Sequence, residues 1–366
     1  MARQGSIERA PIGRGLIERY RRFLPVGPAT PIVTLYEGDT PLLPARGIEE
    51  LLRRETGTSF DVYLKYDGMN PTGSFKDRGM TMAITKAVEE DSRGVVCAST
   101  GNTSAAAAAY AARARLPCFV VIPDGNIALG KLSQAVMHGA KVIAVRGNFD
   151  VALRLVCEVS ERSGLTLVNS LNPYRIDGQQ SAAWEIVEAL GDAPENHFIP
   201  VGNAGNITAY WRGYQLFREA RLCRSLPKMM GFQAAGAAPI VEGAPVEKPQ
   251  TIATAIKIGN PASWKSAVAA RDESGGVIDK VTDDEIVAAY RLLATLEGVF
   301  CEPASAASVA GLLKLGRAGR LSSGGRCVCT LTGHGLKDPE RALSCCSSVT
   351  TVDPDYASVA REILGS

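Results

Sequence analysis

The sequence predicts an α/β fold in which mostly parallel sheets are covered by helices on both sides. The chain has 366 residues, enough for two lobes of an α/β enzyme. From about residue 61 to 332, short β-branched runs alternate with longer alanine-rich segments, as in repeated βαβ units. Small or polar residues directly follow several of the expected strands, where ligands of open α/β sheets bind.

The expected strands are short and nearly all apolar, which is typical of strands buried on both faces of a parallel sheet. They are expected at 62–66, 95–98, 119–122, 142–145, 166–168, 198–201 and 328–331. Helices are expected at 76–89, 103–113, 131–137, 150–162, 179–190, 207–219, 283–296 and 305–315. Two segments, 242–257 and 317–326, break the alternation and are expected to be surface loops.

Composition excludes several classes of partner. Forty basic and 38 acidic side chains give a formal charge of +2 with no dense basic stripe, so nucleic acid is not an expected partner. No apolar run approaches the roughly 20 residues that span a bilayer, and the N-terminus lacks an apolar signal core. We therefore expect a cytoplasmic protein without a membrane partner.

The nine cysteines indicate reduced thiols rather than a disulfide framework or a metal site. Most of them lie singly within apolar stretches. The pairs Cys327/Cys329 and Cys345/Cys346 lack the two-residue gap of zinc sites, and only three histidines could add ligands. We expect no metal.

Lys76 is the first candidate for chemistry. It opens an expected helix after Asn70–Ser74, a run of turn-forming residues that ends a strand. The helix macrodipole disfavours an ammonium at this end and lowers its pKa, as Schiff-base chemistry requires. An ordinary solvated lysine in a first helical turn explains the segment equally well, so Lys76 alone leaves both interpretations open.

A glycine loop follows the strand expected at 198–201. Its residues are Gly202, Asn203, Ala204, Gly205 and Asn206. Such a loop lets the backbone approach an anion while helix N–H groups point at it, which favours a phosphate cradle. A tight turn needs glycine for steric reasons alone, so the loop by itself is weak support. Because neither a Walker loop nor a dinucleotide fingerprint is present, nucleotide cofactors are disfavoured.

A second polar loop comprises Ser99, Thr100, Gly101, Asn102 and Thr103, and five consecutive alanines follow Ser104. Its hydroxyls and helix-start N–H groups suit a carboxylate, and Asn102 could donate to a phenolate oxygen. Helix N-capping explains one of these residues but not five together.

Together, five motifs resemble those of the fold-type II pyridoxal phosphate (PLP) enzymes and, within them, the threonine synthases. The resemblance covers about 40–338 and implies a two-lobed fold with the cofactor in the cleft between the lobes. The motifs are Gly38–Leu42, Asn70–Gly79, Ser99–Thr103, Gly202–Asn206 and Thr332–Asp338.

The resemblance implies a division of the chain into three parts. These are an N-terminal segment at 1–39, the catalytic fold at 40–338 and a C-terminal extension at 339–366. Within the catalytic fold, the smaller lobe would span about 77–180. The larger lobe would be formed by about 40–76 and 181–338.

The resemblance also assigns roles. Lys76 would carry pyridoxal 5'-phosphate as a Schiff base and, once displaced by substrate, move protons at the α and β carbons. Asn102 would donate to the phenolate oxygen, and the Gly202–Asn206 backbone would bind the cofactor phosphate. Thr332 would face the pyridine nitrogen, where a hydroxyl does not enforce a protonated ring. Ser99, Thr100 and Thr103 would hold the substrate carboxylate.

The choice of reaction depends on a second anion site in the segment Asn169–Arg175. Ser170 and Arg175 would supply a hydroxyl and a guanidinium, with Asn203 and Thr103 nearby. Such a site suits O-phosphohomoserine, which threonine synthases convert with water to threonine and phosphate. Without the family, a surface arginine in a loop is the simpler interpretation of Arg175.

Two other functions remain open. Another enzyme on the same scaffold, such as a threonine or serine dehydratase, cysteine synthase or tryptophan synthase β chain, needs no second phosphate site. A non-catalytic amino-acid-binding protein would keep the fold without the chemistry, although the motif residues Lys76, Asn102 and Thr332 argue against it. A homodimer is expected from the family. His334 is expected to be a loop residue near the cofactor rather than a catalytic base.

Overall fold

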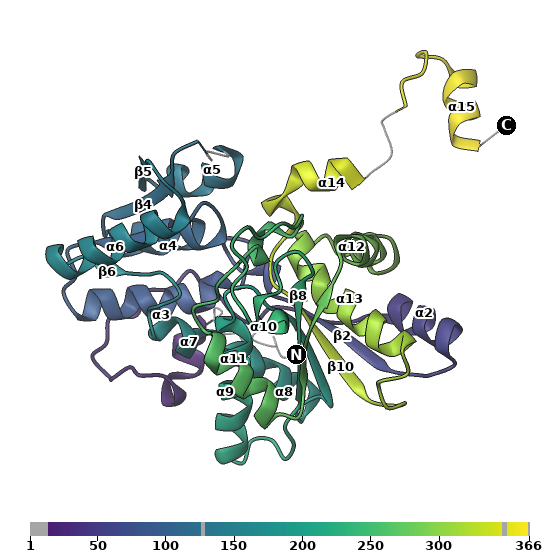
Figure 1. Cartoon of the computed structure of the whole chain (residues 1–366), viewed down its shortest axis with the longest axis horizontal. Coiled ribbons are helices and arrows are strands. Elements are labelled where there is room, and N and C mark those ends of the chain that lie inside the picture. Colours follow the sequence, from purple (N-terminus) through teal and green to yellow (C-terminus); the bar gives the residue numbers. More distant parts are fainter. Residues whose placement is uncertain (1–13, 126–128, 346–349, 365–366) are drawn as a thin grey trace, which may run out of the picture.

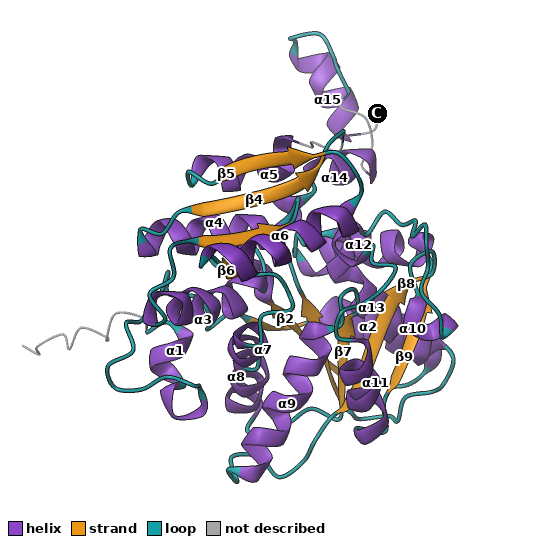
Figure 2. Cartoon of the chain, turned by 60° about the vertical axis from the view of Figure 1, so that its left-hand side comes forward, coloured by secondary structure: helices purple, strands orange, loops and turns teal. Residues whose placement is uncertain are grey.

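The computed structural model describes residues 14–125, 129–345 and 350–364. It contains two separate sheets, which lie side by side with helices around them (Figures 1 and 2). Within the described part, none of the helices has the length and apolar character needed to cross a membrane.

The large sheet has six strands in the order β1-β2-β10-β7-β8-β9. Only the β1–β2 pair is antiparallel, and all other neighbours are parallel. Its strands are β1 (Leu42–Pro44), β2 (Asp61–Tyr66), β7 (Asn196–Pro200), β8 (Lys228–Ala234), β9 (Val277–Val281) and β10 (Arg326–Leu331).

The small sheet has four parallel strands in the order β5-β4-β3-β6. All of them come from one continuous stretch of the chain, between the first and second groups of large-sheet strands. They are β3 (Val95–Ala98), β4 (Cys118–Pro123), β5 (Lys141–Val145) and β6 (Thr166–Leu167).

Helices cover both faces of each sheet, because successive strand residues point to opposite sides and both sides are apolar. On β7, Phe198 packs in one core with α2, α12 and α13, whereas the next residue, Ile199, packs in another with α8, α9 and α11. On β3, Cys97 packs on the side of α3, α4 and α5, and Val96 on the side of α6.

These main helices and the shorter ones have the following bounds. They are α1 (Leu16–Arg19), α2 (Arg46–Thr56), α3 (Lys76–Glu89), α4 (Asn102–Ala114), α5 (Leu129–Met137), α6 (Phe149–Ser163), α7 (Tyr174–Gln179), α8 (Ser181–Leu190), α9 (Gly205–Glu219), α10 (Pro239–Glu242), α11 (Trp264–Glu273), α12 (Asp283–Glu297), α13 (Pro303–Arg317), α14 (Pro339–Cys345) and α15 (Tyr356–Leu364), with 3-10 turns η1 (Arg21–Phe23), η2 (Asp67–Met69), η3 (Thr254–Ile256) and η4 (Gly335–Lys337).

All seven expected strands are present, and the helix expected at 76–89 has those bounds. The helix expected at 179–190 is extended by α7, which begins at Tyr174 and meets α8 at Gln180. Strands β8 and β9 are not among the expected strands, since β8 contains a central glycine and β9 contains Asp279 and Lys280. Gly231 in β8 is needed because a Cβ there would lie 2.8 Å from Val201.

Of the two helices at the C-terminal end, α14 packs the partly buried Ala342 and Cys345 against the core that contains α2, α12 and α13. Neither α14 nor α15 contains a buried residue. In Figure 1, α15 lies away from the rest of the molecule. Residues 339–366 remain a predicted extension, of which α14 and α15 are the described helices.

Candidate active site

The loop from β2 to α3 places Lys76 at the first position of α3. Gly73 adopts a left-handed conformation with φ 84°, which glycine takes without strain. The loop is bound to the strand end of β10: the Phe75 N–H donates to the Thr332 carbonyl and the His334 N–H to the Gly73 carbonyl, both at 2.9 Å. The predicted lysine and the predicted pyridine partner therefore come together.

The surroundings of Lys76 favour a neutral amine. Burial and repulsion from Arg175, opposed by attraction to Glu302, together lower the pKa of Lys76 to about 7. Lys76 Nζ lies 4.3 Å from the centre of the Phe75 ring. An amine with this pKa is about half neutral, and so available as a nucleophile, near neutral pH, unlike an exposed lysine.

A buried ion cluster anchors the first turns of α3. The Arg78 guanidinium, fully buried, pairs with Asp67 at 2.8 Å and with Glu185 at 2.7 Å. Glu185 also pairs with Lys65 at 2.6 Å. Each charge has an opposite partner and several hydrogen bonds, so the cluster holds α3 against β2 and α8.

The polar loop Ser99–Thr103 lies at the start of α4. The Ser99 hydroxyl accepts from the N–H groups of Gly101 at 3.2 Å and Ser104 at 3.3 Å, so it binds one N–H of the first turn of α4, although the N-cap residue is Gly101. The Asn169 side chain pairs with both backbone groups of Ala98 at 2.9 Å, which ties the loop to the end of β6. The Thr100, Asn102 and Thr103 side chains are half-buried.

The glycine loop leads from β7 into α9. Ala204 has φ 64°, and α9 begins at Gly205. A Cβ at Gly202 would lie 2.9 Å from the Cα of Ile256, so this position has room only for glycine. Both polar atoms of the Asn206 side chain are buried without a hydrogen-bond partner in the described structure.

The two residues of the predicted second anion site take different partners. The Asn203 amide donates to the Ser170 hydroxyl, so Ser170 lies at the edge of the glycine loop. Arg175 on α7 is 2% exposed, and its Nη1 donates to the Val168 carbonyl at 3.4 Å. Its Nε has no partner in the described structure. Arg175 is thus a buried residue, in contrast to the surface arginine considered from sequence.

Close packing of α3 and α7 brings Arg175 toward Lys76. A Cβ at Gly79 would lie 2.8 Å from the Arg175 carbonyl oxygen, and one at Gly178 would lie 1.9 Å from the Arg78 carbonyl oxygen. Helices approach this closely only where side chains are absent. The two glycines therefore permit the close approach of α3 and α7, and the Arg175 charge acts on the Lys76 amine.

Thr332 lies beyond β10, and its hydroxyl is 3.1 Å from that of Ser305 on α13. Its hydroxyl also donates to Glu302 Oε1 at 3.4 Å. The nearby His334 ring stacks on Tyr66 at 6.1 Å and accepts from the Leu336 N–H at 3.1 Å. Burial lowers the pKa of His334.

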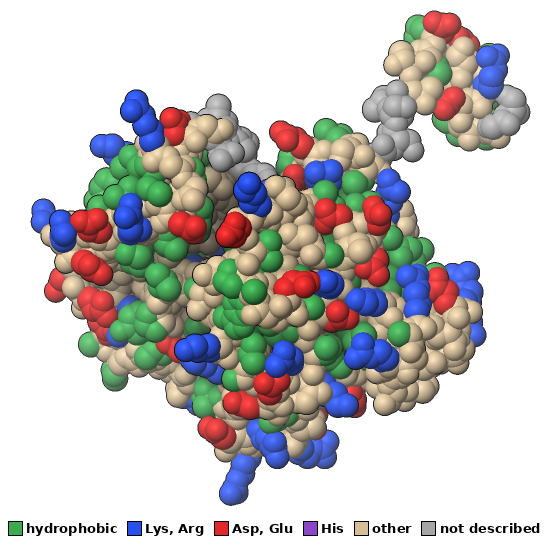
Figure 3. Space-filling view, viewed as in Figure 1, with side chains coloured by type: hydrophobic (Ala, Val, Ile, Leu, Met, Phe, Trp, Pro, Cys, Tyr) green, Lys and Arg blue, Asp and Glu red, His purple; other side chains and the backbone are tan. Residues whose placement is uncertain are grey.

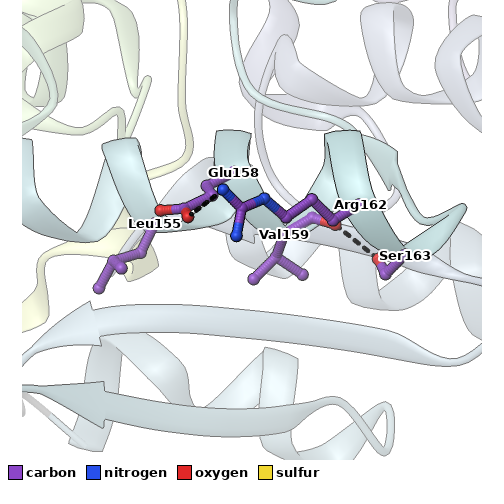
Figure 4. Close-up of a pocket in the computed structure, with 5 residues that line it drawn as sticks. All are labelled: Leu155, Glu158, Val159, Arg162 and Ser163. Carbon is purple, nitrogen blue, oxygen red and sulfur yellow. Dashed lines mark hydrogen bonds and ion pairs between the residues drawn. The ribbon is translucent and has the colours of Figure 1, made fainter.

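Neither the charge pattern of the face in Figure 3 nor the pocket in Figure 4 points to the site. Acidic and basic side chains are interspersed over the face seen in Figure 3. The pocket in Figure 4 is lined by Leu155, Glu158, Val159, Arg162 and Ser163, all on α6, and contains an ordinary Glu158–Arg162 ion pair of 3.0 Å. None of the predicted site residues lines it. Among the described residues, no group of three or more His, Cys, Asp or Glu could hold a metal ion.

Two side chains of the site region are not singled out by the sequence. Arg78 stands within the lysine motif, where nothing local shows its burial or its acidic partners Asp67 and Glu185. Glu302 precedes Pro303 at the start of α13, and the Glu-Pro pair marks a helix start rather than a site. Its contacts with Asn102 and Thr332 depend on three distant segments.

The family model described as "Pyridoxal-phosphate dependent enzyme" matches residues 33–333. The chain is 61% identical over 330 residues to threonine synthase of Synechocystis sp., covering 90% of this chain and 85% of the relative. It is 56% identical over 350 residues to threonine synthase of Mycobacterium tuberculosis, covering 95% and 96%.

Solved structures agree in fold at lower identity. The structure of maize serine racemase matches with a TM-score of 0.72 at 21% identity, covering 84% of this chain and 92% of that chain. Threonine deaminase isoform 2 from Solanum lycopersicum matches with a TM-score of 0.72 at 22% identity, covering 84% and 87%. These likenesses establish the fold.

Proposed function

The chain belongs to the family of pyridoxal-phosphate dependent enzymes, and we propose that its site converts O-phospho-L-homoserine and water to L-threonine and phosphate. Its function is that of a threonine synthase and its cofactor is pyridoxal phosphate. In this reaction phosphate leaves the γ carbon, and water then adds a hydroxyl to the β carbon.

The residues at the glycine loop fit the cofactor phosphate. The unpartnered amide of Asn206 and the N–H groups at the start of α9 are donors in need of an acceptor. Lys76, with its pKa lowered to about 7, fits the aldehyde. Asn102 would hold the phenolate oxygen and Thr332 would face the pyridine nitrogen. When bound, the pyridoxal ring withdraws electrons from the bonds of the substrate α carbon.

Lys76 would act as the base that carries protons between the α and β carbons. Its amine is suited to this task because burial and Arg175 keep it from being fully protonated near neutral pH. Thr100 and Thr103, with the N–H groups at the start of α4, would orient the substrate carboxylate. Ser99 accepts from the Ser104 N–H in the first turn of α4 and would shape this loop.

The observation that carries the choice of reaction is the buried Arg175. A guanidinium that is 2% exposed, with an unpartnered Nε, suits an anion that arrives with the substrate. Together with Ser170 and Asn203 it would bind the phosphate of O-phosphohomoserine. A dehydratase acting on threonine has no phosphate to place there, so this alternative leaves Arg175 without a role.

The test is an assay of purified protein with pyridoxal phosphate and O-phosphohomoserine. We expect equal amounts of phosphate and threonine, and a visible absorption band that disappears in Lys76→Ala. A main activity that forms 2-oxobutyrate from threonine would refute the proposal in favour of a dehydratase. A wild-type protein without a visible band after addition of the cofactor would support the non-catalytic alternative.

The homodimer and the cytoplasmic location expected from the family resemblance remain proposals. Light scattering after size-exclusion chromatography tests the first. Fractionation of the source cells tests the second.

A further inference from the structure

Glu302 lies between two of the proposed cofactor contacts. The Asn102 amide nitrogen donates to its Oε2 at 3.0 Å and to its Oε1 at 3.3 Å. The Thr332 hydroxyl donates to Oε1 at 3.4 Å. Glu302 is 5% exposed, so its carboxyl is held in the protein interior. One side chain thus contacts the residues proposed to hold the phenolate oxygen and the pyridine nitrogen.

The absence of a side chain at Gly333 leaves room for the Glu302 carboxyl. The Glu302 N–H donates to the Gly333 carbonyl at 2.9 Å. A Cβ at Gly333 would lie 2.4 Å from the Glu302 carboxyl carbon. Any side chain at Gly333 would therefore displace the carboxyl, which occupies the space that the glycine leaves free.

The charged groups facing Glu302 come from two elements. Lys76 at the start of α3 and Lys337 on η4 both attract the carboxylate, yet burial dominates and raises the pKa of Glu302. The negative charge of the carboxylate also contributes to the raised pKa values of Tyr66 on β2 and of Cys301. An ionised or a protonated carboxyl can accept an amide N–H, so the contact with Asn102 does not require a charge.

An asparagine amide can present either its oxygen or its nitrogen to a neighbour. A carboxyl that accepts from the amide selects the nitrogen. The NH2 group has two hydrogens that point in different directions, so the two neighbouring oxygens of one carboxyl share one N–H, and the second N–H stays available. Resting on the proposed function, we propose that Glu302 is a positioning residue that holds the Asn102 amide with its second N–H toward the cofactor's phenolate oxygen, and that it orients the Thr332 hydroxyl.

Two substitutions test this proposal, because one changes the ability of the side chain to ionise and the other changes its length. Glu302→Gln keeps the length and an acceptor oxygen but cannot ionise. Glu302→Asp keeps a carboxyl group but places it on a shorter side chain, farther from Asn102. Apoprotein of each variant is titrated with pyridoxal phosphate and followed by visible absorbance. We expect Glu302→Gln to bind within about threefold of wild type, and Glu302→Asp to bind about tenfold or more weakly. The reverse order would overturn the proposal.

A double-mutant cycle tests whether Glu302 acts through Asn102. Asn102→Ala should weaken cofactor binding, and Glu302→Asp should then add less than about threefold to that loss. Full additivity would contradict the proposal. The control is Glu297→Gln, because the Glu297 carboxyl also accepts a hydrogen bond, in this case from the backbone N–H of Ile48 at 2.7 Å, but lies between α2 and α12. It should bind the cofactor as wild type does.

Measurements on wild-type protein distinguish a failure of the proposed function from a failure of the positioning role. If wild-type protein shows no visible band with pyridoxal phosphate, or no phosphate release, the proposed function fails. If wild-type protein shows both and every Glu302 variant binds the cofactor equally well, only the positioning role fails.

Discussion

Replacing Arg175 by methionine separates substrate recognition from folding. The substitution keeps an unbranched stem of similar length and removes the charge. Arg175 is 2% exposed, its side chain donates to the Val168 carbonyl at 3.4 Å, and burial lowers its pKa to about 10, so it remains a cation near neutral pH. Most of its five N–H donors are thus available to a substrate phosphate.

The expected effect on catalysis follows from these donors. Two charge-assisted hydrogen bonds to a phosphate contribute about 1.5 kcal/mol each at the lower limit, or about 3 kcal/mol together. Such a loss corresponds to a reduction in kcat/KM of about a hundredfold or more for Arg175→Met. Because the substitution removes a buried cation without a carboxylate partner in the described structure, the free energy of unfolding should stay unchanged or rise by about 1 kcal/mol.

The assay is phosphate release from O-phosphohomoserine over a range of substrate concentrations, with urea unfolding measured on the same preparation. The visible cofactor band should persist in Arg175→Met. Arg154→Met on the exposed side of α6 is the matched control and should behave as wild type. A reduction in kcat/KM below about fivefold, or a loss of activity matched by a loss of stability, would refute the proposed role.

Three further predictions concern the amine and its support. The rate at which apoprotein takes up pyridoxal phosphate should rise with pH, with a midpoint at about 7, because the neutral fraction of Lys76 grows as the pH passes its lowered pKa. Stopped-flow absorbance measures this rate. A midpoint near 10, the value of an ordinary lysine, would contradict the prediction. In Arg175→Met this midpoint should move upward, since a repelling charge is lost. Arg78→Met should lower the free energy of unfolding by about 3 kcal/mol or more in urea, as Asp67 and Glu185 lose their buried partner; a change below about 1 kcal/mol would argue against the anchoring role.

The strands and the loops after them were predictable because each rests on local sequence. Continuous apolar runs mark strands buried on both faces, and the Gly202–Asn206 turn needs its small residues wherever it occurs. The helix at 76–89 could likewise be placed from its turn-forming entry and its periodicity. Strands β8 and β9 could not, since a glycine interrupts the apolar residues of β8 and Asp279 and Lys280 interrupt those of β9.

The contacts between distant segments were beyond a single sequence. Glu302 meets Asn102 across 200 positions, and Arg78 meets Glu185 across 107. Local pattern carries no information on such pairs, because packing of the two sheets brings them together. The burial of Arg175 belongs to the same class: it depends on the close approach of α3 and α7 at Gly79 and Gly178.

The most direct test of the central claim follows the oxygen of water. The reaction is run to completion with O-phosphohomoserine in water labelled with the heavy oxygen isotope, and both products are analysed by mass spectrometry. Elimination of phosphate followed by addition of water predicts the label in the hydroxyl of threonine and none incorporated into phosphate by the enzyme. Label in the phosphate, with homoserine as the other product, would show cleavage of the phosphorus–oxygen bond and contradict the account.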